Sequence, residues 1–219
     1  MTVLSRTASR ASTAAAAMAS ALAYPFLHQR VASHFDANGR FDRYSSRATV
    51  AITFPAMMTG LSIINDRLGA WPGGQDREDG ASGVQAREEA IGLIELALLQ
   101  AHLAVLARGA GLPIDMDRVN RGMFGALLIG LGNVLPKLPR NGLIGIRTPW
   151  TLADPTVWER THRLGGYLLT AAGVMGVASM VTKSKRMAQF PLAATLGAVG
   201  LSAVYSFVVY TTRSRSKRR

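Results

Sequence analysis

The sequence contains no cysteine, and its acidic and aromatic residues are few. The absence of cysteine excludes disulfide bonds, cysteine-ligated zinc and thiol chemistry. Only 13 Asp and Glu residues stand against 25 Lys and Arg residues, which gives a formal net charge of +12. The sequence also shows no nucleophile–base pair and no set of metal ligands. We therefore expect no catalytic residue, no metal and no cofactor.

The excess of positive charge is a typical footprint of nucleic-acid binding, but the placement of the basic residues argues against it. The Lys and Arg residues fall in short segments between apolar runs and in the terminal stretch "RSRSKRR". Polytopic membrane proteins keep their basic residues in such places. We therefore expect a lipid bilayer as the surroundings of the chain and no direct binding of nucleic acid.

Apolar stretches recur along the chain, in which 48% of the residues are hydrophobic. A bilayer core of roughly 30 Å needs about 20 helical residues. These lengths predict an all-α membrane protein with about six transmembrane helices. The predicted spans are residues 11–27, 48–65, 90–107, 122–136, 164–182 and 187–212. The fourth is the shortest, and the first, which is mostly Ala and Ser, is the least hydrophobic.

The first of these stretches has a second interpretation. Arg6 and Arg10 precede an Ala-rich run, and "ALA" stands before Tyr24, as in a cleavable signal peptide. We favour a retained first helix. Cleavage would leave five spans and move one end of the chain across the membrane.

Six spans place both termini on one side of the membrane. That side holds 15 of the 25 basic residues, which favours cytoplasmic termini. The Gly- and charge-rich residues 66–89 predict a flexible linker. The predicted organisation is a two-span portion (1–65), the linker (66–89), a four-span portion (90–212) and a basic tail (213–219).

The segment after the first span predicts a small hairpin outside the membrane. Asn38-Gly39 is a strong tight-turn signal, and "SHF" and "RFDRY" flank it as short extended pieces. His28 and His34 lie near each other there, but two histidines without a third ligand make a poor metal site. We interpret them as exposed loop histidines.

Two ionisable residues interrupt the third predicted span. Glu95 and His102 are seven residues apart and therefore lie on one face of a helix. Ionisable groups at membrane depth usually face a bundle interior or a wet cavity, so the pair is a candidate intramembrane polar site. The alternative is a structural role, in which both are hydrogen-bonded to neighbouring helices. Asn133 of the fourth span is one candidate partner.

The fourth predicted span carries small residues at four-residue intervals, namely Gly122, Ala126 and Gly130. A stripe of this kind lets another helix approach closely. We expect it to serve helix packing.

The stretch "IGIRTPWTLADPTVWERTHRLGGYL", residues 144–168, concentrates polar and aromatic residues beside the fifth span. Asp154-Pro155 predicts a helix start, with Asp as the N-cap and Pro in the first turn. Trp158, Thr161, His162 and Gly165 would form one stripe of that helix, with Arg160 and Arg163 pointing elsewhere.

Two interpretations of this stretch remain open. Trp150 and Trp158 suit a membrane-interface anchor, where an indole is half buried. Anchoring does not require "GIRTPWT", however, where Arg147 presents a rigid fork of donors beside a Pro-fixed turn. That combination favours a structured juxtamembrane loop, between the fourth and fifth spans, that recognises a partner.

Residues 133–168 resemble the signature of the SdpI family of membrane immunity proteins, and "AYPFLHQRVASHFDANGRFDRYSSR" is similar to the DUF1648 segment that often precedes it. The DUF1648 likeness rests on Pro25, Phe35 and three residues of the predicted extracellular loop, His34, Gly39 and Asp42. The SdpI likeness implies a partner-binding set in the juxtamembrane loop. That set is Lys137, Arg147, Thr148, Pro149, Trp150, Thr151, Trp158, His162 and Arg163.

The resemblance also implies a location and a function. The expected location is the bacterial cytoplasmic membrane, with the signature loop on the cytoplasmic side. The expected function is immunity to a secreted peptide toxin, capture of a cytoplasmic transcriptional repressor, or both. The alternative is a small transporter or a protein acting on a lipid-linked substrate through Glu95 and His102.

Overall fold

The computed structural model describes residues 3–35, 41–70, 80–142, 144–181 and 185–216. Helices make up most of this part of the chain. The helices are α1 (Val3–Ala23), α2 (Arg47–Ala70), α3 (Gly80–Gly109), α4 (Met116–Val134), α5 (Pro149–Ala153), α6 (Pro155–Ala178) and α7 (Lys185–Ser216). Two strands, β1 (Arg30–Phe35) and β2 (Phe41–Ser46), lie between α1 and α2.

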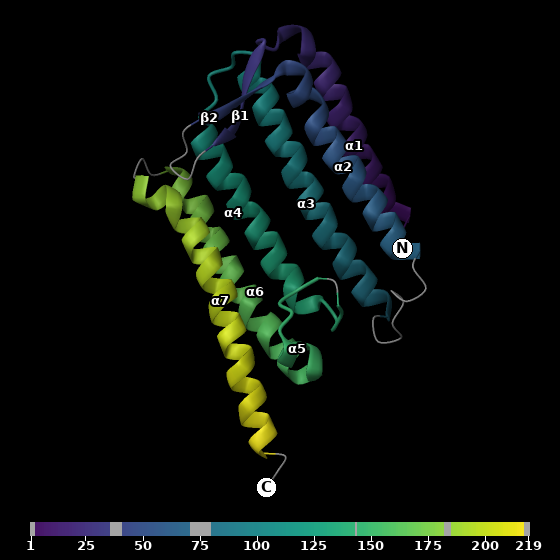
Figure 1. The fold of residues 1–219 in the computed structure, drawn as a ribbon, viewed down its shortest axis with the longest axis vertical. Coiled ribbons are helices and arrows are strands. Elements are labelled where there is room, and N and C mark those ends of the chain that lie inside the picture. The colour runs from purple at the N-terminus through teal and green to yellow at the C-terminus, as the bar shows by residue number, and fades with distance from the viewer. Residues whose placement is uncertain (1–2, 36–40, 71–79, 143, 182–184, 217–219) are drawn as a thin grey trace.

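The long helices run side by side and alternate in direction (Figure 1). The β-hairpin lies at one end of the bundle, near the connection from α3 to α4. Both chain termini point away from the hairpin, toward the end at which α5 lies. This arrangement brings α5 and its flanking loop to the same end as the two termini.

Four of the described helices are long and apolar enough to cross a membrane, so the predicted six spans are not confirmed. The four candidate spans are Arg47–Arg67, Gly83–Gly109, Pro155–Val181 and Leu192–Arg215. In α1 the run of Ala and Ser around Arg6 and Arg10 lowers the hydropathy. In α4 the charges of Asp117, Arg118 and Arg121 occupy the first two turns of a helix of only 19 residues.

The predicted hairpin is present, so a short antiparallel sheet has to be added to the predicted all-α fold. Arg30 pairs with Ser46 and Phe35 with Phe41, with register irregularities near His34. Val31 of β1 is buried and packs against α3, where it lies close to Gly109. The predicted turn at Asn38-Gly39 lies outside the described residues, and of Asp42 only the backbone is described.

The predicted linker is shorter in the structure than in the sequence analysis. Helix α2 continues to Ala70 and α3 begins at Gly80, so both ends of residues 66–89 are helical. The helices pack in two groups, α1 with α2 and α3, and α4 with α6 and α7, and α3 contacts α4 between them. The predicted two-span portion therefore packs against α3, most of which belongs to the predicted four-span portion.

Helices α4 and α6 approach each other through glycines, but not through the predicted stripe. A Cβ on Gly132 would lie 2.7 Å from the carbonyl oxygen of Gly166, and a Cβ on Gly125 would lie 2.7 Å from that of Gly173. Gly130 instead faces the side chain of Leu93, Gly122 faces Met180, and Ala126 is exposed. The two close contacts recur at seven-residue spacing on both helices and form the α4–α6 glycine seam.

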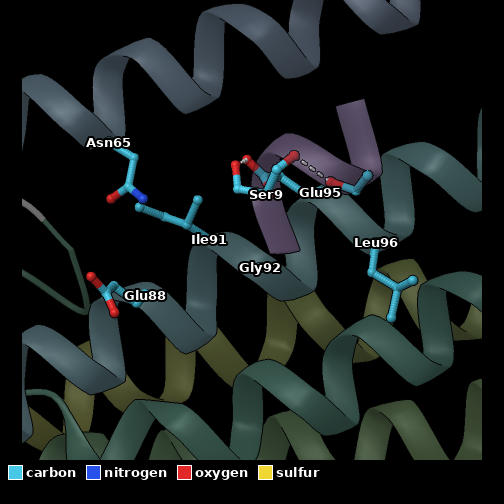
Figure 2. A pocket seen from close by; sticks show the side chains of 8 residues that line it. Ser9, Asn65, Glu88, Ile91, Gly92, Glu95 and Leu96 are labelled. Atoms are coloured by element: carbon cyan, nitrogen blue, oxygen red, sulfur yellow. Dashed lines mark hydrogen bonds between the residues drawn. The ribbon is translucent and has the colours of Figure 1, made fainter. Parts of the chain in front are cut away.

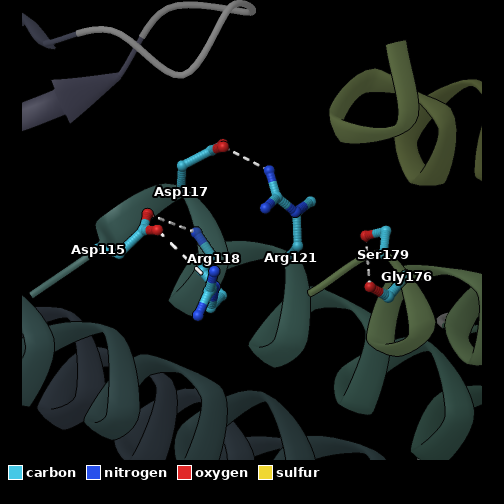
Figure 3. A network of polar contacts seen from close by, with 6 residues as sticks. All are labelled: Asp115, Asp117, Arg118, Arg121, Gly176 and Ser179. Atoms are coloured by element: carbon cyan, nitrogen blue, oxygen red, sulfur yellow. Dashed lines mark hydrogen bonds and ion pairs between the residues drawn. The ribbon is translucent and has the colours of Figure 1, made fainter. Parts of the chain in front are cut away.

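A polar network fixes the start of α4 at the hairpin end of the bundle (Figure 3). Asp115 is the N-cap and accepts a hydrogen bond from the backbone N–H of Arg118 at 3.1 Å. The buried Arg121 pairs with Asp117 one turn earlier. Ser179, at the end of α6, donates to the carbonyl oxygen of Gly176 at 2.6 Å. These contacts satisfy polar groups where the helices leave the apolar region.

Candidate functional site: the juxtamembrane loop

The short helix α5 is built by the "TPWT" stretch of the sequence. Thr148 is its N-cap, Pro149 takes the first helical position, and Thr148 and Thr151 form a reciprocal capping box. Thr151 is fully buried, and its hydroxyl donates to the carbonyl oxygen of Ile146 at 2.9 Å. Thr148 and Thr151 therefore hold the loop in shape rather than face a partner.

Trp150 ties α5 to α7. Its indole N–H donates to the hydroxyl of Ser206, and its ring meets Phe207 edge-on with centroids 5.1 Å apart. The hydroxyl of Thr148 lies 3.2 Å from the same Ser206 oxygen. The loop is thus anchored on a helix that begins 35 residues after Trp150 in the sequence.

His162 and Trp158 of α6 form the floor under the loop. Their rings stack with centroids 3.9 Å apart. His162 Nε2 accepts a hydrogen bond from the backbone N–H of Ile146 at 3.0 Å, and Nδ1 lies 2.9 Å from the carbonyl oxygen of Trp158. One ring nitrogen must accept and the other must donate, so these contacts define a neutral imidazole with the proton on Nδ1.

The predicted stripe on α6 is confirmed, because Trp158, Thr161, His162 and Gly165 are all buried. Trp158 is only 3% exposed, and its indole N–H donates to the carbonyl oxygen of Leu138 at 2.8 Å. Its ring is therefore enclosed by protein and not half wet, which does not fit the predicted interfacial anchor.

Gly145 passes directly over this pair. It adopts a φ of +119°, which side chains rarely allow, and a Cβ there would lie 3.2 Å from Trp158 Cη2 and would collide with His162 Nε2. The glycine thus allows the main chain to lie close enough for Ile146 to reach His162.

Asp154 closes the loop, as the sequence predicts, by capping α6. Its carboxylate accepts from the backbone N–H groups of Thr156 and Val157, at 2.8 and 3.2 Å. It also accepts from Arg213 Nε of α7 at 3.2 Å. Burial raises the pKa of Asp154, but the two backbone hydrogen bonds and Arg213 outweigh it and hold the pKa below its usual value. The carboxylate is therefore charged at neutral pH.

Four of the predicted partner-binding residues lie on the outside of the loop, namely Lys137, Arg147, Pro149 and Arg163. Lys137 pairs with Glu89 at 3.3 Å, and Arg163 pairs with Glu159 one turn earlier. Arg147 Nη1 donates to the carbonyl oxygen of Gly142. The outer face is basic, and the predicted set divides into these outward residues and five inward ones.

The intramembrane pair is buried on α3, but the structure gives it partners on α1. The hydroxyl of Ser9 donates to Glu95 Oε1 at 2.6 Å. Ser20 lies 2.8 Å from His102 Nε2. Asn133 is exposed on α4 and has no contact with the pair. Each residue of the pair thus has its own serine, and no hydrogen bond joins Glu95 to His102.

Several residues of these sites carry no signal in the sequence that places them there. Ser206 and Arg213 lie in the last helix and belong to the loop only through tertiary packing. Glu88 had been placed in the linker, although it continues the seven-residue spacing of Glu95 and His102 and is also buried. The seven-residue spacing is the local signal that could have placed Glu88 on the same face of α3 as Glu95 and His102.

The fold and the site define a helical integral membrane protein whose juxtamembrane loop is folded onto its last two helices. Residues 137–211, which are less than half of the chain, match the SdpI/YfhL protein family. Residues 11–59 match a domain of unknown function, DUF1648. The resemblance seen in the sequence is confirmed in both parts.

One curated relative is the "Immunity protein SdpI" of Bacillus subtilis (strain 168). It is 37% identical over 91 residues, which cover 41% of this chain and 43% of the relative. The match thus spans less than half of either protein. No solved structure matches the chain.

Proposed function

We propose that this protein is an SdpI-like membrane immunity protein, which protects its cell against a secreted peptide toxin. The observation that carries the proposal is the SdpI/YfhL match over residues 137–211, which includes the juxtamembrane loop and both helices that hold it. The relative that matches is named as an immunity protein.

The loop supports a binding function over a purely anchoring one. Its two tryptophans contact protein, through Ser206 and Leu138, so neither indole N–H is left for the lipid interface. Its outer face presents basic side chains around Arg147. A guanidinium on a stiff loop binds a carboxylate or phosphate in a bidentate way that an ammonium does not reproduce. In this proposal the loop is cytoplasmic, and its outer face captures a repressor that carries an acidic surface.

Toxin challenge of a sensitive bacterial host tests the immunity. Cells expressing the protein are exposed to a panel of secreted peptide toxins, with membrane levels measured by immunoblot. Protection against at least one toxin is expected. Full sensitivity to every toxin at normal membrane levels would contradict the proposal.

Conservative Arg-to-Lys changes test the loop surface. We expect Arg147→Lys to lose repressor capture, measured as the fraction of the repressor recovered with membranes, while its accumulation is unchanged. Arg160→Lys, on the exposed side of α6, is the matched control and should capture normally. Wild-type capture by Arg147→Lys would show that the guanidinium has no such role.

A further inference from the structure

A cavity of about 240 Å³ lies among α1, α2 and α3 (Figure 2). Its walls carry Ser9 and Ser12 from α1, Asn65 from α2, and Glu88 and Glu95 from α3. The described lining thus contains two carboxylates and no Lys or Arg, in a chain with nearly twice as many basic as acidic residues. The cavity is suited to a cationic group.

Asn65 lines this cavity from α2. Its side chain is only 7% exposed and points from α2 toward Ile91 of α3 (Figure 2). Within the described part of the chain no hydrogen bond to its amide is found. An amide that faces a cavity in this way can accept and donate hydrogen bonds to a group that enters it.

Glu95 has a carboxylate oxygen that can accept further hydrogen bonds. It is 2% exposed, and Ser9 occupies Oε1. Among the residues that the structure describes, no hydrogen bond reaches Oε2. A carboxylate at membrane depth needs compensation by charge or by hydrogen bonds, and one serine supplies only part of it.

The volume of the cavity and the oxygen atoms on its wall indicate which kind of cation fits. A cavity of about 240 Å³ is far larger than a single ion or water requires, since a water occupies about 30 Å³. A primary ammonium group has three N–H donors and no acceptor. Such a group matches a wall that offers an amide oxygen and carboxylate oxygens from different helices.

The position of the cavity beside membrane-spanning segments indicates that the ammonium group belongs to a lipid. Gly92 and Leu96 line the cavity and are exposed on a membrane-spanning segment of α3, with Leu96 50% exposed. An exposed leucine there faces lipid. Asn65 and Glu88 lie within a few residues of the ends of the candidate spans Arg47–Arg67 and Gly83–Gly109. A headgroup can therefore reach the cavity from the interface while its acyl chains stay in the bilayer.

We propose that this cavity binds the primary ammonium headgroup of an aminophospholipid through Asn65 and Glu95. The site is separate from the juxtamembrane loop and does not depend on the proposed immunity. A phospholipid with a choline headgroup cannot form these hydrogen bonds, because its quaternary nitrogen has no N–H.

Lipid retention tests the site. The protein is reconstituted in nanodiscs with equal amounts of phosphatidylethanolamine and phosphatidylcholine of matched chains, released into mild detergent, and its bound lipid is counted by native mass spectrometry. We expect the wild type to retain phosphatidylethanolamine about tenfold over phosphatidylcholine, since one charge-assisted hydrogen bond is worth about that factor. Glu95→Gln and Asn65→Leu should reduce the preference to about twofold or less by the same reasoning.

The controls make each outcome decisive. Asn133→Leu removes an exposed asparagine on α4 and should leave the preference unchanged. Glu95→Gln keeps the size and the Ser9 acceptor, so it decides the test even if Asn65→Leu does not fold. Equal retention of the two lipids by the wild type would overturn the proposal, as would an unchanged preference in Glu95→Gln. Binding of a lysine-containing peptide without any lipid preference would assign the cavity to another source of ammonium and overturn the lipid proposal.

Discussion

Gly145 is the residue on which the loop geometry depends most directly. Its positive φ and its position over His162 are both incompatible with a side chain. The sequence showed a glycine before "IRTPWT" but could not show that a histidine 17 residues later would lie beneath it. The motif residues Gly145, Trp158 and His162 are therefore explained together by one packing arrangement.

We expect Gly145→Ala to destabilise the protein. Forcing a non-glycine residue into this backbone region costs about 1–3 kcal/mol, and the methyl group would also collide with His162. The melting temperature in detergent, followed by tryptophan fluorescence, should fall by at least about 2 °C.

Gly142→Ala is the matched control for this prediction, because a Cβ at Gly142 meets no atom within 4 Å. Its melting temperature should equal that of the wild type. Equal melting temperatures of Gly145→Ala and Gly142→Ala would contradict the close contact between Gly145 and His162.

At the scale of elements, the α4–α6 glycine seam brings the backbones of these two helices close together. Both of its close contacts involve backbone atoms, so neither helix can relax by moving a side chain. Small residues at such contacts permit the van der Waals packing that drives helix association in lipid. The seam therefore contributes strongly to the position of α6, and with it to the position of the loop.

Alanine substitutions in the seam should separate the two helices. We expect Gly132→Ala or Gly173→Ala to destabilise the protein by about 1–3 kcal/mol. The added methyl group would meet backbone atoms, which cannot move aside as a flexible side chain can. Thermal unfolding in detergent measures this loss. Gly200→Ala in α7 meets no atom within 4 Å and should be neutral or stabilising. Stability of Gly132→Ala equal to that of Gly200→Ala would rule out the close approach.

The elements that the sequence predicts well are those with local signals. Asp154-Pro155 predicts the start of α6, and Asn38-Gly39 predicts a hairpin whose strands are present. The sequence predicts that small residues of α4 serve helix packing, but it does not show which of them face α6, because glycines at several spacings occur in this helix. Only the partner helix decides between Gly130 and Gly132.

The partners of Glu95 and His102 were missed for a related reason. The Ala- and Ser-rich α1 is the least hydrophobic of the predicted spans, and its serines are ordinary for such a helix. Ser9 and Ser20 gain a role only when α1 packs against α3. Likewise Trp158 suits a membrane interface by type, but Leu138 and His162 enclose it.

For the whole molecule, the structure separates the hairpin from the juxtamembrane loop by the length of the bundle (Figure 1). The two termini lie toward the loop end. If the bundle spans the membrane, the hairpin and the loop face opposite compartments, and the excess of basic residues on the loop side favours the cytoplasm for the loop.

Single-cysteine labelling measures this orientation against a background free of native thiols. A cysteine at His34, exposed on β1, should react with an impermeant maleimide in intact cells. A cysteine at Asn141 should react only after lysis, and the cysteine-free parent should not react at all. Labelling of the Asn141 position in intact cells would reverse the proposed orientation.

Helix α7 contacts the loop at two points that lie seven residues apart, Ser206 and Arg213. Two turns of helix separate them, so they fall on one face of α7. Two such contacts fix the rotation of the helix about its own axis as well as its position. A displacement that rotated the C-terminal half of α7 would therefore loosen Trp150 and Asp154 together, so both ends of the loop depend on the setting of one helix.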